Sequence, residues 1–308
     1  MSSALAKPWL SEYPTDVPQT INIDEFRSVA EVLQRAFERF RHRPAFICMD
    51  KVISYADLDR LSLQFACFLR NKLGLAKGDR VAIMLPNVLQ YPVALTGILR
   101  AGLTVVNTNP MYTARELKHQ LNDSGAVAIL VLENFAKTVE EVLGETQVKH
   151  IITTAVGDLL GFPKSLIVNF VVKYRKKAVP AFSLPNAIKF NDALREGGGQ
   201  KLPPTEIGHQ DIAFLQYTGG TTGVSKGAML THRNMVANML QVRNWFGANV
   251  REGDEIIITA LPLYHIFALT CNCLVFMNVG GLNVLIPNPR DMPGFVKELS
   301  KFKFTVVT

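Results

Sequence analysis

Tyr217-Thr-Gly-Gly-Thr-Thr-Gly-Val-Ser-Lys-Gly-Ala228 concentrates more chemistry than any other stretch of this chain. Its glycines leave the backbone bare, so that main-chain N–H groups can approach an anion closely. Hydroxyl donors lie among these glycines, and Lys226 adds a mobile positive charge. We therefore expect a polyphosphate-binding loop formed by Tyr217, Thr218, Gly219, Gly220, Thr221, Thr222, Gly223, Val224, Ser225, Lys226, Gly227 and Ala228.

Two other interpretations of this loop are less favourable. A Walker A loop ends in Gly-Lys-Ser/Thr, but here Gly223 is followed by Val224 and Lys226 by Gly227. That order argues against an unrelated P-loop kinase or ATPase. A Gly/Thr-rich hairpin turn is the structural alternative, yet a turn requires neither several hydroxyl groups nor a lysine.

Regular elements are predicted on both sides of the loop. Residues 211–217 have the pattern of a strand that leads into it, and residues 228–230 that of a short strand that leaves it. Thr231 then predicts the N-cap of a helix that places Met235 and Met239 on one face. The loop should therefore be held between regular elements, as a phosphate clamp requires.

Working outward from the loop, the chain repeats one pattern twice. Each pass runs from a strand ending in Leu-Pro, at 85–86 and at 261–262, through an apolar helix that ends at glycine. The interval from that glycine to the next Asn-Pro is seven residues in both passes, 102 to 109 and 281 to 288. The pattern predicts an α/β fold made of two related doubly wound β-α-β lobes. Chance similarity between two buried stretches is the alternative.

The predicted lobes set the expected domain boundaries. Lobe one covers about 45–156, a connecting region about 157–208, and the phosphate loop with lobe two about 209–308. Within the connecting region, the apolar residues 166–172 are followed by a basic cluster at 173–177. This arrangement fits either a core helix with a solvated basic end or a contact with a membrane surface.

Capping residues predict where several helices begin. Ser28 with Glu31, and Thr113 with Glu116, have the spacing of capping boxes, in which each side chain bonds to the other residue's backbone N–H. A further helix is expected over about 56–73.

Composition restricts the partners and the compartment. The net charge of +7 favours an anionic partner, but the chain has no basic stripe with interleaved aromatics, so we expect no nucleic acid. A polyphosphate ligand and an anionic membrane surface fit better. The four cysteines have no zinc-site spacing, which favours a reducing, cytoplasmic location. No apolar run is long enough for a signal peptide or a membrane span, so any membrane contact should be peripheral, on the cytoplasmic face of the inner membrane.

The loop resembles the signature Tyr-Thr-Ser-Gly-Thr-Thr-Gly-x-Pro-Lys-Gly of the adenylate-forming enzymes. Residues 9–14, 85–92, 119–125 and 261–267 resemble bacterial long-chain-fatty-acid–CoA ligases, and the likeness extends from about residue 8 to residue 308. The resemblance implies that residues 1–308 form an incomplete AMP-binding, or adenylation, N-terminal domain.

The resemblance also implies a reaction. The loop would hold the β- and γ-phosphates of ATP while the carboxylate of a long-chain fatty acid attacks the α-phosphate, and the thiol of CoA would then displace AMP. Lys226 and Thr221 of the loop would have catalytic roles, with Mg²⁺ as the cofactor. His265, which follows a predicted buried strand, would lie beside the carboxylate and the α-phosphate. A core histidine bonded to the backbone is the alternative for His265.

Departures from the family pattern limit these expectations. Gly219 stands where most relatives have serine or threonine, so a hydroxyl is missing and the metal ligands stay unknown. Neither Tyr-Gly-x-Thr-Glu nor Thr-Gly-Asp, which would supply ligands for Mg²⁺ and the ribose, occurs in the sequence. We therefore expect a chain truncated before the C-terminal lid and inactive alone. A non-catalytic nucleotide- or acyl-binding module is the alternative function, and whether the chain is a fragment or a short product stays open.

Overall fold

The structure is a computed structural model that describes residues 7–218 and 224–308. The centre of the predicted phosphate loop, residues 219–223, lies outside this part of the chain. The predicted catalytic role of Thr221 and the predicted contacts of Gly219, Gly220, Thr222 and Gly223 therefore fall outside the described residues.

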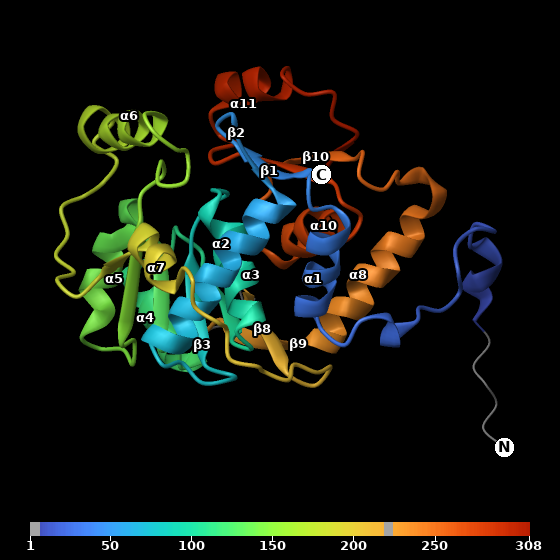
Figure 1. The fold of residues 1–308 in the computed structure, drawn as a ribbon, viewed down its shortest axis with the longest axis horizontal. Helices are drawn as coiled ribbons and strands as arrows, with labels where there is room; N and C mark the ends of the chain where they lie inside the picture. The colour runs from blue at the N-terminus through green and yellow to red at the C-terminus, as the bar shows by residue number, and fades with distance from the viewer. Residues whose placement is uncertain (1–6, 219–223) are drawn as a thin grey trace.

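Two β-sheets form the framework of an α/β fold, as the sequence predicted (Figure 1). The first sheet has the strand order β7-β6-β5-β3-β4-β8-β9 and is parallel except for β9. Its strands are β3 (Arg80–Met84), β4 (Thr104–Asn107), β5 (Ala128–Leu132), β6 (His150–Thr154), β7 (Ile188–Lys189), β8 (Ile212–Thr218) and β9 (Lys226–Thr231).

The second sheet is smaller and has the order β12-β10-β11-β1-β2. It is parallel except for β2, which pairs with β1 in an antiparallel hairpin. Its strands are β1 (Pro44–Cys48), β2 (Lys51–Ser54), β10 (Ile256–Thr259), β11 (Leu282–Leu285) and β12 (Val306–Val307).

The predicted internal repeat is present in both sheets. The order β5-β3-β4 in the first sheet corresponds to β12-β10-β11 in the second, so the strands of each pass occupy equivalent places. The registers also match: Arg80 pairs with Thr104 at the start of one repeat, and Ile256 pairs with Leu282 at the start of the other. A shared strand order with a shared register supports two related lobes over chance similarity.

The sheets divide the chain differently from the expected lobe boundaries of about 45–156 and 209–308. Strand β1, near the start of lobe one, pairs with β11 of the second sheet and carries β2 with it, and β8 pairs with β4 of the first sheet and carries β9 with it. The connecting region, expected over 157–208, contributes β7 to the edge of the first sheet. The reason is that β4 and β11 would otherwise be unpaired edges, and strand pairing across the chain covers them.

The helices are α1 (Val29–Arg39), α2 (Tyr55–Cys67), α3 (Gln90–Arg100), α4 (Ala114–Ser124), α5 (Ala136–Leu143), α6 (Lys164–Phe170), α7 (Phe190–Gly197), α8 (His232–Phe246), α9 (Ile266–Ala268), α10 (Val275–Asn278) and α11 (Met292–Leu299). Three π-helical turns extend helices: η3 (Phe68–Lys72), η5 (Val171–Arg175) and η7 (Leu269–Leu274). Short 3₁₀ turns are η1 (Pro8–Glu12), η2 (Ile23–Glu25), η4 (Glu133–Phe135) and η6 (Gly247–Asn249). None of the helices within the described residues is both long and apolar enough to cross a bilayer.

Most of the predicted helix starts are confirmed. Thr113 and Glu116 form a complete capping box, and Thr231 caps α8. The box predicted at Ser28 is only half formed: the Ser28 hydroxyl accepts the Glu31 N–H, but the Glu31 carboxylate accepts the N–H of Arg27 instead of Ser28. The Glu31 carboxylate therefore accepts its hydrogen bond from the residue before the N-cap.

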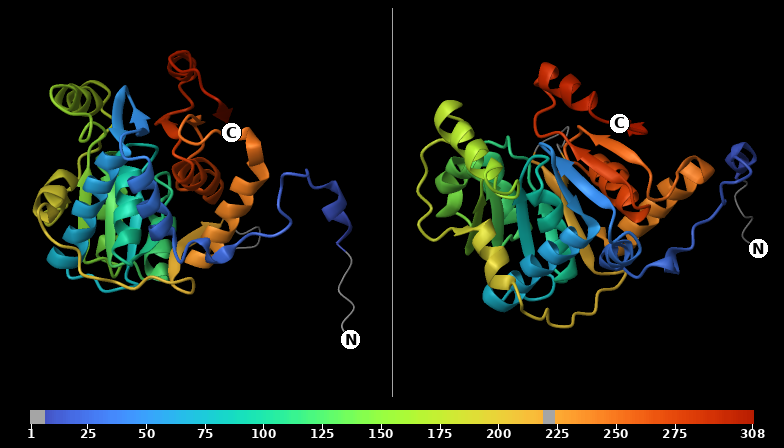
Figure 2. Two further views of the ribbon diagram at one scale, coloured as in Figure 1. Left: turned by 45° about the vertical axis from the view of Figure 1, so that its right-hand side comes forward. Right: turned by 45° about the horizontal axis from the view of Figure 1, so that its top comes forward.

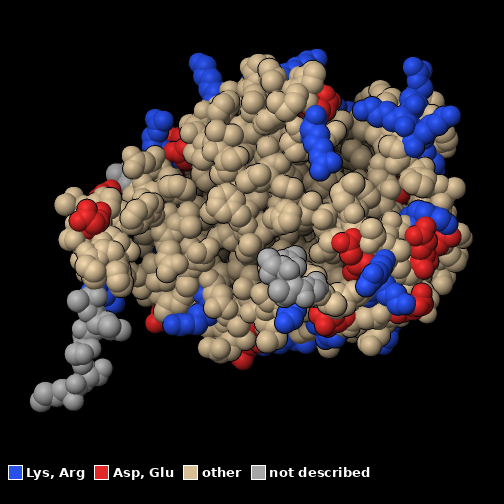
Figure 3. Space-filling view, turned by 180° about the vertical axis from the view of Figure 1, so that it is seen from behind, with Lys and Arg blue, Asp and Glu red and all other residues tan. Residues whose placement is uncertain are grey.

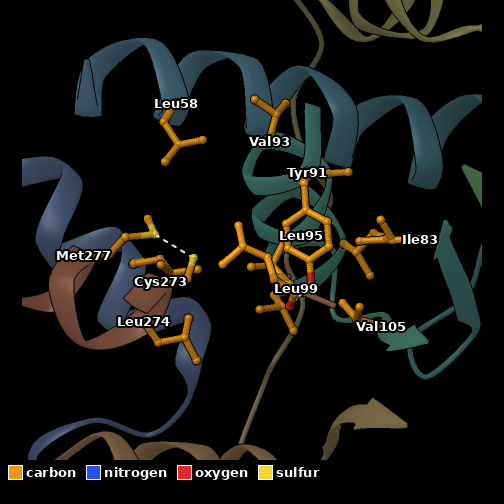
Figure 4. Packing of buried hydrophobic residues seen from close by; sticks show 14 of the residues in the cluster. Leu58, Ile83, Tyr91, Val93, Leu95, Leu99, Val105, Cys273, Leu274 and Met277 are labelled. Carbon is orange, nitrogen blue, oxygen red and sulfur yellow. Dashed lines mark hydrogen bonds between the residues drawn. The ribbon is translucent and has the colours of Figure 1, made fainter. Parts of the chain in front are cut away.

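One hydrophobic core joins the two sheets. In Figure 1, α2 and α3 lie in the middle of the molecule with α1 and α10 nearby. Figure 4 shows Tyr91 and Leu95 of α3 close to Cys273 and Met277 of the second repeat. The buried Tyr55 hydroxyl donates to the Gly281 carbonyl oxygen at 2.9 Å. The two repeats therefore share one interior.

The outer faces of the sheets have smaller cores of their own. Helices α4 and α5 cover the outer face of the first sheet, where Leu117 and Val139 are buried. The outer face of the second sheet is covered by α11, whose Phe295 and Leu299 pack against Ile258. Figure 2 shows the two covered sheets side by side, with α6 at the margin of the molecule in both views.

Candidate nucleotide and acyl site

The phosphate loop connects the two strands of an antiparallel hairpin. Strands β8 and β9 pair up to Thr218 opposite Lys226, so residues 219–225 span the end of the hairpin. The Ser225 hydroxyl donates to the Thr218 carbonyl oxygen at 2.8 Å and closes the base of the loop. The two strands that flank the loop therefore form an antiparallel pair, and this arrangement is compatible with phosphate binding.

Helix α4 holds both ends of the loop. The Tyr217 hydroxyl donates to the Asp123 carboxylate at 2.6 Å, and the His119 ring Nε2 lies 2.8 Å from the Ser225 carbonyl oxygen. His119 Nε2 must carry the proton there, because a carbonyl oxygen only accepts. Burial raises the pKa of Tyr217 well above its ordinary value, and the Asp123 carboxylate adds to the rise. Tyr217 therefore stays a neutral donor.

Gly227 is required by the packing beneath Tyr217. A Cβ atom at Gly227 would lie 2.9 Å from two ring carbons of Tyr217, which is closer than van der Waals contact permits. The glycine therefore lets β9 pass directly under the ring that anchors the other side of the loop.

Lys226 lies at the first position of β9, where the strand leaves the loop. Its side chain is exposed, and no ion pair between described residues includes it. The ammonium group is therefore accessible to an anion from solvent. Its role in nucleotide binding stays a prediction, as do those of Thr218, Val224, Ser225 and Ala228.

His265 follows the second sheet at the start of α9. The chain leaves β10 at Thr259 and reaches His265 through a short turn, in which the His265 N–H donates to the Pro262 carbonyl oxygen. The side chain is exposed, which argues against the alternative of a core histidine. Partial desolvation lowers the pKa of its imidazole, so the ring is neutral at pH 7 and can donate or accept a hydrogen bond.

Asn87 fixes the turn that carries His265. Its amide nitrogen donates to the carbonyl oxygens of Thr259 and Leu261 at 2.9 and 3.0 Å, and its amide oxygen accepts the Leu263 N–H at 2.9 Å. Asn87 is buried and follows β3. A side chain from the first repeat therefore satisfies the backbone of the equivalent connection in the second repeat.

A second buried chain of hydrogen bonds reaches the same turn from β4 and β8. The Asn107 amide nitrogen donates to Gln216 Oε1 at 3.0 Å, and Gln216 Nε2 donates to the Tyr264 carbonyl oxygen at 3.0 Å. The Tyr91 hydroxyl lies 2.7 Å from both Asn107 Oδ1 and the Leu263 carbonyl oxygen. These bonds tie the residues just before His265 to the sheet that carries the phosphate loop.

Tyr112 lies between the loop and this turn. Its hydroxyl is hydrogen-bonded to the Ser225 side chain. Burial raises the pKa of Tyr264, and the nearby Tyr112 adds to the rise. The loop after β8 and the turn after β10 therefore approach one another at the carboxyl ends of parallel strands, where ligands bind in open α/β sheets.

A cavity of about 460 Å³ lies beside the turn after β10. Its walls come from residues just after the strands of both repeats, including Pro86, Pro110 and Leu132 on one side and Pro262 and Pro287 on the other. Tyr264 also lines it, and Lys176 and Arg290 supply positive charge. The cavity is thus a largely apolar space with cationic groups in its wall.

The helix after His265 does not line this cavity. The apolar side chains that follow His265 are absent from the cavity wall: Ile266, Phe267, Ala268, Leu269 and Leu274. Ala268, Leu269 and Leu274 are buried in the shared core. The apolar character of this helix therefore reflects packing.

Sequence reasoning missed several residues that build the site. His119, Asp123, Asn87 and Tyr91 lie within stretches that carry the family resemblance, but the pattern assigned them no role. For Asn87 and Tyr91, which are buried, the signal was a polar group within an apolar segment, whereas the exposed Asp123 and the partly exposed His119 gave no such signal. Gln216 lies in the predicted strand 211–217 and gives the same signal as Asn87.

Metal ligands remain unassigned. Over residues 7–218 and 224–308, no group of three His, Cys, Asp or Glu side chains is arranged to hold a metal ion. The described part of the site therefore offers hydrogen-bond donors and positive charge, without a carboxylate cluster.

Comparison with known proteins shows the family to which this architecture belongs. A family model described as AMP-binding enzyme matches residues 33–308. The chain is 56% identical over 304 residues to a long-chain-fatty-acid–CoA ligase of Salmonella typhimurium and 49% identical over 308 residues to one of Haemophilus influenzae. In both cases the match covers 99% of this chain and 54% of the relative.

A solved structure shows the same fold. The crystal structure of a long-chain-fatty-acid–CoA ligase from Archaeoglobus fulgidus superposes with a TM-score of 0.76 at 23% identity, covering 96% of this chain and 54% of that one. The chain therefore spans about half the length of the curated relatives it matches.

Proposed function

This chain belongs to the AMP-binding enzyme family, and we propose that its function is the activation of long-chain fatty acids. ATP and the fatty acid would give acyl-adenylate and pyrophosphate, and CoA would then give acyl-CoA and AMP. The observation that carries the proposal is the contact between two segments: Gln216 of β8, the strand that leads into the phosphate loop, bonds to Tyr264 in the His265 turn, and this turn lines an apolar cavity. The similarity to bacterial long-chain-fatty-acid–CoA ligases supports it.

The proposed roles follow from position and charge. Residues 217–228 would surround the phosphates, and the exposed Lys226 would stabilise the negative charge that gathers as the α-phosphate is attacked. His265, neutral at pH 7, would hydrogen-bond to the carboxylate or the α-phosphate without needing to titrate. Asn87 and Gln216 would be positioning residues, because they hold the backbone that carries His265.

The cavity supports a long apolar substrate. Proline and valine are the most frequent apolar residues in its wall, while Lys176 and Arg290 offer charge for a carboxylate. Each buried methylene group contributes about 0.8 kcal/mol, so a chain of roughly twelve or more carbons would gain far more from such a space than acetate would.

We propose Mg²⁺ only as a cation bound to the nucleotide. Because the described residues contain no cluster of metal-ligating side chains, we assign it no protein ligand and derive no step from one. Mg²⁺ would arrive as the magnesium complex of ATP.

A cytoplasmic location with a peripheral contact at the inner membrane is also part of the proposal. Free cysteines, most of them buried, and anionic cytoplasmic substrates are its support. The contact itself is argued separately below.

A non-catalytic nucleotide- or acyl-binding module is the second candidate. It is favoured by one observation: the 308 residues contain neither Tyr-Gly-x-Thr-Glu nor Thr-Gly-Asp. The two functions share the loop and the cavity and differ only in turnover.

A chimera tests the proposed reaction. Residues 1–308 would be joined to the part of the Salmonella typhimurium ligase that the chain does not match, and fatty-acid-dependent exchange of pyrophosphate into ATP would be measured. We expect exchange with hexadecanoate to exceed that with acetate. Lys226→Ala should lower the rate by about 10²–10³-fold, as for the loss of one transition-state donor.

Lys201→Ala is the matched control, because Lys201 is an exposed lysine that lies outside the loop. It should leave the exchange rate unchanged. Exchange at the unmodified rate in Lys226→Ala would contradict the loop assignment, and a preference for acetate would contradict the substrate class.

A further inference from the structure

One exposed surface of the molecule is unusually apolar. It is formed by α6, the π-helical turn η5 and the loop before them, and we call it the α6–η5 surface. Its large apolar side chains are between 56% and 86% exposed: Phe162, Leu166, Ile167, Phe170 and Tyr174. Neither α6 nor η5 contains a buried residue. The sequence-based alternative of a core helix is therefore wrong, because the apolar residues face outward.

These side chains share one face of a continuous helix. Leu166, Phe170 and Tyr174 are four residues apart and lie along one side, and the rings of Phe170 and Tyr174 are 5.2 Å apart. Contiguous exposed apolar side chains usually mark a site of interaction, whereas isolated ones need no explanation.

The opposite side of the same helix is firmly attached to the protein. Asn169 accepts the Gly157 N–H at 2.7 Å and donates to the Asp158 carboxylate at 3.1 Å. Lys164 bonds to the carboxylate of Asp50 and to the backbone of the β1–β2 turn. The exposed face is therefore held outward by a helix whose other face is fixed.

Positive charge adjoins this apolar face. Lys173, Arg175, Lys176 and Lys177 are all exposed, and none of them belongs to an ion pair between described residues. Figure 3 shows Lys and Arg side chains gathered at the upper right, over the end of the molecule that carries α6. Lysines elsewhere, such as Lys164, Lys189 and Lys301, do have carboxylate partners.

The combination selects the kind of partner. An apolar helical face alone would fit another protein, but an apolar face bordered by unpaired cations fits a bilayer with anionic headgroups. We propose that the α6–η5 surface docks on an anionic lipid leaflet, with Leu166, Ile167 and Phe170 below the headgroups and the basic cluster among them.

The surface is also continuous with the cavity. Val172 of η5 and Lys176, which directly follows η5, belong to the cavity wall, while Lys173 and Tyr174 are exposed to solvent. A docked molecule would therefore bring the mouth of an apolar cavity close to the lipid. Only this consequence rests on the proposed function, because it assumes an amphiphilic substrate.

Vesicle flotation of the 308-residue chain tests the docking, without nucleotide or fatty acid. We expect the chain to float with vesicles of phosphatidylcholine containing phosphatidylglycerol, and about tenfold less with phosphatidylcholine alone. Raising the salt concentration should weaken the binding, because the attraction is screened.

Two variants test the apolar part and the basic part of the surface separately. Leu166→Ser with Phe170→Ser removes apolar area, and Lys173→Gln with Lys177→Gln removes two charges; each should lower flotation with anionic vesicles about tenfold. Lys72→Gln with Lys201→Gln is the control, because it removes the same charge from exposed positions outside the surface. Circular dichroism spectra and unfolding midpoints should agree among all variants, since every changed side chain is exposed.

Three results would overturn the proposal. They are equal flotation with neutral and anionic vesicles, equal loss in the control variant, and loss of a dimer in Leu166→Ser/Phe170→Ser with flotation unchanged. The last result would show that a second copy of the chain covers the surface. Failure of the ligase activity would leave these outcomes unaffected, so the two proposals are tested separately.

Discussion

His232 shows how burial fixes the charge of one side chain. It begins α8 with almost no exposed surface, and its Nδ1 accepts the N–H of Val29 at 3.1 Å. Burial lowers the pKa of His232 to about 4, although Asp211 acts in the opposite direction. The ring is therefore neutral, and it joins α8 to α1 only in that form.

The lowered pKa predicts a dependence of stability on pH. In the unfolded chain the pKa of histidine is about 6.5, so the unfolded state binds a proton before the folded state does. The contribution is fully present above pH 6.5 and is lost as the pH falls toward 4. Between pH 7 and pH 5 we expect His232 to lower the free energy of unfolding by about 2 kcal/mol.

Urea unfolding at both pH values measures this loss. His232→Asn keeps a polar side chain but does not titrate, so the decrease between pH 7 and pH 5 should be about 2 kcal/mol smaller in the variant. Parallel decreases in the two proteins would mean that His232 does not control this range.

At the scale of elements, helices and strands that depend on neighbouring residues can be predicted from the sequence, whereas the pairing of distant strands cannot. The strand leading into the loop, the caps of α4 and α8, and the repeated strand–helix units could be predicted because each depends on neighbouring residues. The pairing of β1 with β11 and of β8 with β4 could not, because it joins segments that are far apart in the chain. The π-helical turns after α2 and α6 likewise have no local signature.

The candidate site likewise has features that the sequence predicts and contacts that it does not. A glycine-rich stretch and a histidine after a strand are visible in the sequence. The contacts of Asn87 with residues 259–263 bridge more than 170 positions, so no local pattern predicts them. Buried polar residues in apolar elements indicate that such partners exist, but they do not identify them.

Asn87 provides a test of how the two repeats are connected. Asn87→Ala removes three hydrogen bonds and leaves the buried Leu263 N–H without its partner, which should cost about 2–3 kcal/mol of unfolding free energy. Urea unfolding measures this loss. Asn122→Ala is the matched control, because Asn122 makes one exposed hydrogen bond to the Glu145 carbonyl oxygen, and it should cost less than about 0.5 kcal/mol. Equal losses in the two variants would show that the connection does not depend on Asn87.

At the scale of the whole molecule, the repeats face each other across one interior. The strand β3 lies between β5 and β4, and β10 lies between β12 and β11, so in each repeat the strand order reverses at the central strand while the strands stay parallel. The connections after these two strands, which carry Asn87 and His265, are bonded to one another and line or border one cavity. The candidate site is therefore formed where the equivalent connections of the two repeats meet.

This site lies open to water, which leads to the last prediction. Thr218, Lys226 and His265 are all exposed, and water weakens electrostatic contacts that a closed site would strengthen. The motifs that the family resemblance implies for Mg²⁺ and ribose binding are also absent from residues 1–308. We therefore expect a polypeptide of these residues to bind ATP weakly and to release no AMP above background when hexadecanoate and CoA are added.

Release of AMP by the purified 308-residue chain is the measurement, with the chimera described above as the positive control. Weak ATP binding that is reduced in Lys226→Ala, together with the absence of turnover, would show that the loop binds phosphates without completing the reaction. Sustained AMP release by residues 1–308 would require that the exposed loop and the His265 turn suffice for catalysis, and it would contradict the argument that an open site is too well hydrated to stabilise the transition state.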